Sequence, residues 1–190
     1  MRILLLAAAT AALSFNAQAH NDHHGAHHGD QHGHHGEGHG RHMSHDPALR
    51  HYHQHAKHLL LQLQQQNGDD IGAQAKALVE LSKPLLSRFE QQYPQCDEYL
   101  TALNNVADTL ADLPLEEIES GYHADGKLPP LPTAECYHAK DLLVHPATVQ
   151  AMARIGMKQA DDWRDAAHEI EEVLEHFTQV QSAIGQVAAQ

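Results

Sequence analysis

The segment ADDWRDAAHEIEEVLEHFTQVQSAIGQ, residues 160–186, decides the fold class of this chain. Its apolar residues recur every three or four positions, which places them on one face of an α-helix. These residues are Trp163, Ala167, Ile170, Val173, Leu174, Phe177, Val180 and Ile184. Because a long helix with one apolar face is stable only when other elements cover that face, the rest of the chain must supply packing partners.

Several preceding segments show the same helical spacing and can supply these partners. The first begins at Asp46-Pro47, an N-cap residue followed by proline at the first helical position, and ends at Asn67-Gly68. A kink is expected at Pro84 in the second helix, because proline removes a backbone donor. The further helices are expected over about residues 70–93, 97–112, 133–144 and 146–156.

The arrangement of these segments predicts the architecture. None of them alternates apolar and polar residues as a half-buried strand does, so we expect an all-α fold. The short connections favour an antiparallel bundle of about four main helices, formed by residues 46–190. Within it, the proline-rich region 115–156 is expected to form a broken, hooked connection.

The N-terminal nineteen residues have the pattern of a secretory signal peptide. Arg2 is followed by an apolar run over residues 3–13, and Ala17-Gln18-Ala19 is a small-x-small cleavage site. We expect cleavage after Ala19 and a periplasmic mature protein. The apolar run is about half the roughly 20 residues that span a bilayer, so we expect no membrane insertion after cleavage; the alternative is an uncleaved anchor.

The two cysteines, Cys96 and Cys136, are expected to form one disulfide. An even number of cysteines in an oxidising compartment favours a bridge, and neither residue lies in a CxxC or other catalytic signature. The bridge would close a loop of about 40 residues and contribute about 4 kcal/mol in the chain-entropy model. It would pin the hooked connection to the bundle.

Residues 20–45 contain eleven histidines among glycines and acidic residues, and they lack apolar periodicity. We expect this segment to be disordered without a ligand. Neutral imidazole is a good ligand for Zn(II), Ni(II) and Cu(II), so the segment predicts several bound ions of modest affinity; the alternative is a solvated linker. The predicted ligands are His20, His23, His24, His27, His28, His32, His34, His35, His39, His42 and His45.

Histidines and carboxylates also recur at helical spacing on three expected helices. Residues four apart are neighbours on a helix surface and can chelate one ion together. All three stripes are expected to face away from the apolar faces. The first two are candidate ligand sets, to which loop residue His123 could add, and the third is interpreted as a solvated face. The stripes are His51, His55 and His58; His138, Asp141 and His145; and His168, Glu172 and His176.

Composition and motifs narrow the class of function. A formal net charge of −13 with neutral histidine argues against nucleic acid as a partner. The sequence contains no HExxH, CxxCH or GxSxG motif and no phosphate-binding loop, and no carboxylate–histidine pair is expected to point into the bundle. We therefore expect no enzyme activity, and rank a metalloenzyme with a site inside the bundle last.

The leading hypothesis is a periplasmic binding protein that buffers, scavenges or carries Zn, Ni or Cu. The alternative is a metal- or pH-responsive adaptor that regulates a membrane sensor or transporter. In composition, residues 20–58 resemble the histidine-rich segments of bacterial periplasmic zinc, nickel and copper handling proteins. This resemblance implies metal handling for that segment and carries no information about the helical domain.

We predict that a chain lacking residues 20–45 keeps its helical content but loses most of its bound ions. The apolar faces that build the helices begin after Asp46, whereas eleven of the histidines lie in the deleted segment. Circular dichroism and titration calorimetry with Zn(II), Ni(II) and Cu(II) on both chains test the two halves. Equal ion counts in the two chains would show that the segment is only a linker.

Overall fold

The computed structural model describes residues 46–187, and all regular structure in that range is helical. The all-α prediction is therefore confirmed for the described part of the chain. The predicted signal peptide and the histidine-rich segment, residues 1–45, lie outside the described residues. The elements are α1 (Pro47–Gln64), α2 (Ile71–Gln92), η1 (Pro94–Cys96), α3 (Asp97–Asn104), α4 (Ala107–Leu110), α5 (Leu115–Ile118), η2 (Glu119–His123), α6 (Ala134–Ile155) and α7 (Ala160–Val187).

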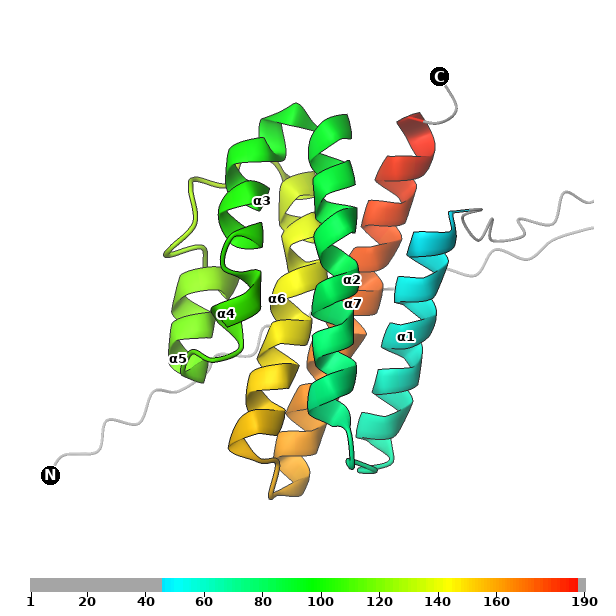
Figure 1. The fold of residues 1–190 in the computed structure, drawn as a ribbon, viewed down its shortest axis with the longest axis vertical. Helices are drawn as coiled ribbons and strands as arrows, with labels where there is room; N and C mark the ends of the chain where they lie inside the picture. The colour runs from blue at the N-terminus through cyan, green and yellow to red at the C-terminus, as the bar shows by residue number, and fades with distance from the viewer. Residues whose placement is uncertain (1–45, 188–190) are drawn as a thin grey trace, which may run out of the picture. The chain divides into compact units, whose positions relative to one another are not determined.

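Helix α6 is the central element of the fold. It packs against α2 and α7, and it also contacts α3, α4, α5 and η2. Helix α1 packs against α2 and α7. In Figure 1, α1, α2, α6 and α7 lie side by side and successive members run in opposite directions, while α3, α4 and α5 lie on the side of α6 away from α1.

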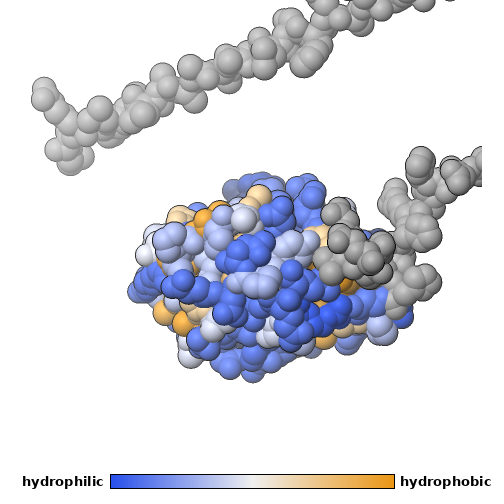
Figure 2. Space-filling model, turned by 90° about the horizontal axis from the view of Figure 1, so that it is seen from above, coloured by the Kyte–Doolittle hydropathy of each residue, from blue (hydrophilic) through white to orange (hydrophobic). Residues whose placement is uncertain are grey.

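Helices α1 and α7 form as their sequences predict. The side chain of Asp46 caps α1 by accepting hydrogen bonds from the backbone N–H groups of Ala48 (2.8 Å) and Leu49 (3.3 Å). On α7 the predicted face is buried, with Trp163 and Leu174 half-buried at its border. Figure 2 shows one outer face of the molecule, where hydrophilic residues predominate and apolar residues are scattered.

Helix α6 differs from the others because it is enclosed on all sides. Every residue from 139 to 149 is buried. Helices enclosed in this way are normally apolar all round, yet α6 carries polar residues along this stretch. These are Lys140, Asp141, His145 and Thr148. Enclosure of α6 therefore forces two charged side chains and an imidazole into the interior.

The predicted break at Pro146 was wrong, because α6 runs without interruption from Ala134 to Ile155. Proline has no backbone N–H, so the carbonyl oxygen of Leu142, one turn earlier, loses its usual partner. The hydroxyl of Tyr52 on α1 replaces that partner by donating a hydrogen bond of 2.6 Å to the Leu142 oxygen. A side chain from another helix thus satisfies the buried carbonyl and allows α6 to continue.

Helix α2 continues through Pro84, in agreement with the single helix expected over about residues 70–93. The carbonyl that the proline frees belongs to the exposed residue Glu80 and can bond to water. One other expected boundary differs. The helix expected over residues 97–112 is divided into α3 and α4, with a turn at residues 105–106. These differences leave the helical class unchanged.

The predicted disulfide is confirmed. Cys96 and Cys136 are bonded, and both are fully buried. The bridge joins the start of α3 to the first turn of α6, so it closes a loop containing α3, α4, α5 and η2. Of the helices that the structure describes, none combines the length and apolar character needed to cross a membrane.

We predict that Tyr52→Phe lowers the free energy of unfolding by about 1–3 kcal/mol, because it leaves the buried Leu142 carbonyl without a donor. Denaturant unfolding measures the loss. In a Pro146→Ala background the new backbone N–H can donate to the same oxygen. Tyr52→Phe should therefore lower the free energy of unfolding by less in that background. An equal cost in both backgrounds would show that the hydroxyl does not compensate for the proline.

Candidate metal centre

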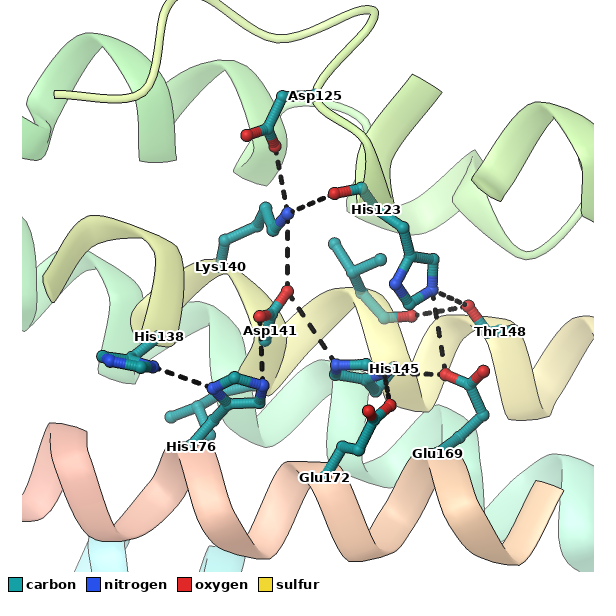
Figure 3. Close-up of polar contacts among 12 residues, drawn as sticks. His123, Asp125, His138, Lys140, Asp141, His145, Thr148, Glu169, Glu172 and His176 are labelled. Atoms are coloured by element: carbon teal, nitrogen blue, oxygen red, sulfur yellow. Dashed lines mark hydrogen bonds and ion pairs between the residues drawn. The ribbon is translucent and has the colours of Figure 1, made fainter. Parts of the chain in front are cut away.

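A continuous cluster of polar side chains lies between α6, α7 and η2 (Figure 3). In the figure it runs along α6 and α7, from His138 and His176 at one end, past Asp141 and His145, to Glu169 and His123 at the other. Among the described residues, two groups of three bring potential ligand atoms within 4.8 Å of one another. We call them the Asp141 trio (Asp141, His145, His176) and the Glu169 trio (His123, His145, Glu169).

The Asp141 trio is the more deeply buried group. Asp141 is fully buried and His145 is 4% exposed, and both lie on α6 four residues apart. His176 comes from α7, and its Nε2 lies 3.2 Å from Oδ2 of Asp141. The Nε2 of His145 lies 3.9 Å from Oδ1 of the same carboxylate. Three electron-pair donors therefore surround one point in the interior.

These contacts are not hydrogen bonds. Among the described residues, neither carboxylate oxygen of Asp141 nor the Nε2 of His145 has a partner at ordinary hydrogen-bond geometry, although all three atoms are buried. The polar groups that face the carboxylate are the Lys140 ammonium, 3.5 Å from Oδ1, and the Tyr137 side chain, and both oppose the rise that burial causes in the pKa of Asp141. A buried polar atom without a partner costs about 1–3 kcal/mol, and more when it belongs to a charged group. Three such atoms facing one another form an arrangement that a bound cation would stabilise.

The Nδ1 atoms of His145 and His176, which point away from Asp141, do have polar partners. His145 Nδ1 lies 2.7 Å from Oε2 of Glu169, and His176 Nδ1 lies 2.9 Å from Nδ1 of His138. With Glu169 ionised, His145 carries its proton on Nδ1 and donates it to that carboxylate. The lone pair of its Nε2 then faces Asp141. Metal-binding histidines are typically oriented by an outer hydrogen bond of this kind.

Burial also favours the protonation state that binds metal. Removal from water lowers the pKa of His145 to about 4, against an opposing effect of Glu172. Burial likewise lowers the pKa of His176 to about 4, and the neighbouring His145 and His138 lower it further. Both imidazoles are therefore neutral at pH 7, the form in which they act as ligands. Burial raises the pKa of Asp141 to about 7, opposed by the Lys140 ammonium.

Lys140 brings the η2 segment against α6. Its fully buried ammonium donates to the backbone oxygen of His123 (2.8 Å) and to Oδ1 of Asp125 (3.0 Å), and it lies 3.5 Å from Oδ1 of Asp141. The hydroxyl of Tyr99 donates to the same Asp125 oxygen at 2.6 Å. These bonds fold the segment over α6 and carry His123 into the cluster.

The Glu169 trio is formed where this segment meets α7. His123 Nε2 lies 2.9 Å from the hydroxyl oxygen of Thr148 and 3.7 Å from Oε2 of Glu169. Burial raises the pKa of Glu169 and lowers the pKa of His123. In contrast to the Asp141 trio, the ligand atoms of this group already contact polar partners.

The structure brings together some predicted site residues and leaves others apart. His51 and His58 are exposed on α1, while His55 is half-buried with its Nε2 3.0 Å from the backbone oxygen of Gln74. None of these three belongs to either trio. Of the second stripe, Asp141 and His145 are ligand candidates, and His138 contacts His176 instead. The predicted ligands from His20 to His45 lie outside the described residues.

Two expectations about orientation were wrong. The second stripe faces the interior, because α6 is enclosed and leaves Asp141 and His145 no route to solvent. The third stripe divides: His168 is 67% exposed at its side chain, as predicted, whereas His176 is 17% exposed and faces Asp141. A carboxylate–histidine group therefore does point inward. The uninterrupted apolar run 142–144 beside Asp141 and His145 was the sequence signal of an enclosed helix.

Comparison with protein-family models, curated proteins and solved structures gave no match. The chemistry of the cluster itself is therefore the basis for inferring function.

We predict that Lys140→Met lowers the free energy of unfolding by about 3–5 kcal/mol, because it leaves the buried Asp141 and the half-buried Asp125 without their cation. The matched control is Lys127→Met, which removes a half-exposed pair with Glu117 and should change stability little. Denaturant unfolding of the three proteins compares them. Similar stabilities for the two variants would contradict a structural role for Lys140.

Proposed function

We propose that this protein binds a divalent transition metal ion, Zn(II), Ni(II) or Cu(II), at Asp141, His145 and His176, in addition to ions held by its histidine-rich segment. In this proposal it is a periplasmic protein that buffers, scavenges or carries metal. We also propose that α1, α2, α6 and α7 constitute the antiparallel four-helix bundle expected from the sequence, with the ion in its core. Contact with a membrane transporter or sensor stays a prediction.

The observation that carries the proposal is the group of three buried, unpartnered atoms in the Asp141 trio. A cluster built only for stability would be expected to pair such atoms, as buried polar groups in folded proteins generally are. Other buried side-chain oxygens in the described residues also lack hydrogen bonds, but those of this cluster, Asp141 Oδ1 and Oδ2 and His145 Nε2, are grouped together and are all metal-ligand atoms. Their placement opposite a third ligand, His176, favours a cation as the missing partner.

The spacing of the ligand atoms supports a first-row transition metal. Ligands bound at about 2.0–2.2 Å around a tetrahedral ion lie roughly 3.3–3.6 Å apart. His176 Nε2 lies 3.2 Å from Asp141 Oδ2, and His145 Nε2 lies 3.9 Å from the other oxygen, Oδ1; each distance is within a few tenths of an ångström of that range. The three residues have ligand atoms within 4.8 Å of one another. Two imidazoles and one carboxylate form a donor set used for Zn(II), and they leave a fourth position for water or another ligand.

We propose binding in preference to catalysis because of the burial of the site. A catalytic ion must be reached by substrate, whereas Asp141 is fully buried and His145 is 4% exposed. A cleft of about 200 Å³ between α2, α6 and α7 is lined by His138, which contacts His176, and not by the trio itself. Exchange of a small ion through the His138 side requires far less room than exchange of an organic substrate.

The proposal is tested on the full chain with Asp141→Asn, which keeps the shape of the side chain but removes its charge. The control is His168→Ala, which removes an exposed histidine from the same helix, α7. Competition for Zn(II) against a fluorescent chelator measures the affinity of the site that binds Zn(II) most tightly.

We expect Asp141→Asn to weaken that affinity by more than the roughly 10- to 100-fold produced by losing an outer hydrogen-bonding partner, and His168→Ala to leave it unchanged. Glu169→Gln, which alters the outer partner of His145, should fall in the 10- to 100-fold range. Circular dichroism confirms folding of each variant. If Asp141→Asn retains the affinity of the control, the ion is held elsewhere.

A further inference from the structure

His145 belongs to both trios, and each of its ring nitrogens faces a different carboxylate. Nε2 lies 3.9 Å from Oδ1 of Asp141, and Nδ1 lies 2.7 Å from Oε2 of Glu169. Beyond each carboxylate stands a second imidazole: His176 Nε2 lies 3.2 Å from Asp141, and His123 Nε2 lies 3.7 Å from Glu169. The two trios therefore repeat one donor set, a carboxylate and a histidine, on the two sides of a shared ring (Figure 3).

A neutral imidazole has one nitrogen with a free lone pair and one that carries a proton. His145 can therefore bind metal through Nε2 or through Nδ1, but not through both at once unless it loses its last proton. Whichever nitrogen binds the ion, the other is protonated and faces an acceptor carboxylate. Asp141 and Glu169 can thus exchange the tasks of ligand and hydrogen-bond acceptor.

We propose that the helical domain holds one divalent transition metal ion at a time, in either of two overlapping positions that share His145. The first position is the Asp141 trio and the second is the Glu169 trio. This inference rests on the proposed function, since it requires an ion at His145. The inference adds a second ligand set to the proposed function and limits the helical domain to one bound ion. It also gives the ion a path of a few ångströms between the two positions.

Transfer between the positions is balanced in protons and charge. The bond from the ion to Nε2 breaks and a bond to Nδ1 forms. The proton on Nδ1 passes to water, directly or by way of Glu169, and water supplies the proton added at Nε2, so Asp141 and Glu169 are both ionised at the end. His145 carries one proton before and after, so no net proton is taken up or released. The ion faces one ligand carboxylate and two neutral imidazoles in both positions.

The first position should be the tighter one. Among the described residues, Asp141 Oδ1 and Oδ2 and His145 Nε2 have no hydrogen bond of ordinary geometry to give up, and the Lys140 ammonium is 3.5 Å from Oδ1. An ion entering the Glu169 trio must instead displace the His145–Glu169 contact of 2.7 Å and the His123–Thr148 contact of 2.9 Å. In the unaltered protein the ion therefore occupies the second position less often than the first. Removal of His176 should shift the ion to the second position.

The test uses full-length protein labelled with ¹⁵N-histidine and one equivalent of Zn(II). Nitrogen chemical shifts report which ring nitrogen of His145 is protonated and which is bound to metal, and a His145→Ala variant identifies its signals. In the unaltered protein we expect zinc on Nε2 and the proton on Nδ1. In His176→Ala we expect the reverse, with one ion still bound but roughly tenfold or more weaker.

Two further variants complete the design. His123→Ala should leave the original pattern intact, because the ion occupies the other trio. The double variant His123→Ala/His176→Ala should release the ion from His145, since neither trio is then complete. Asp141→Asn replaces His176→Ala as the variant that empties the first position if the latter fails to fold.

The outcomes separate the two proposals. If zinc leaves both nitrogens of His145 unchanged in the unaltered protein, the proposed function fails and this inference fails with it. If zinc binds Nε2 there but His176→Ala abolishes binding, or keeps it on Nε2, the function stands and the second position is wrong. A His145 with metal on both nitrogens at saturating zinc would overturn the limit of one ion.

Discussion

The enclosure of α6 is the constraint on which the rest of the structure depends. A helix surrounded by α2, α7 and the α3–η2 region has no face for polar residues, yet this one carries Lys140, Asp141 and His145. Removing such groups from water is costly, so the surrounding elements must supply compensating partners. The Lys140 ammonium obtains them from η2 and the loop after it, and the Leu142 carbonyl obtains one from Tyr52.

The same constraint explains why fold and site cannot be separated in this protein. The bonds that compensate the Lys140 ammonium also fold His123 toward Glu169, and the helix pairing that covers α6 brings His176 to Asp141. Compensation is weakest at Asp141 and His145. The Lys140 ammonium lies 3.5 Å from Oδ1 of Asp141, but neither carboxylate oxygen nor His145 Nε2 has a partner at ordinary hydrogen-bond geometry within residues 46–187. The cluster is therefore better satisfied at its edges than at its centre, which is the observation on which the proposed metal site depends.

Sequence reasoning predicted the helical class, the Asp46 cap, the face of α7 and the Cys96–Cys136 bridge, because each depends on local spacing or residue type. It failed at Pro146, since the Leu142 carbonyl that the proline leaves without a donor is satisfied by Tyr52, 90 positions before Leu142. It also placed the Asp141 stripe outside, because periodicity assumes that a helix has a solvent face. His176 was dismissed for the same reason, as its partner lies on another helix.

The Cys96–Cys136 bridge acts on the two trios unequally. Tyr99, His123 and Asp125, which form the hydrogen-bond network of the Lys140 ammonium outside α6, all lie in the loop that the bridge closes. In a reduced chain the backbone alone joins the two ends of this segment, so folding it over α6 carries a larger entropic cost. Thiol oxidation therefore stabilises the approach of His123 to Glu169, whereas Asp141, His145 and His176 lie outside the loop and are brought together by the packing of α6 and α7 alone.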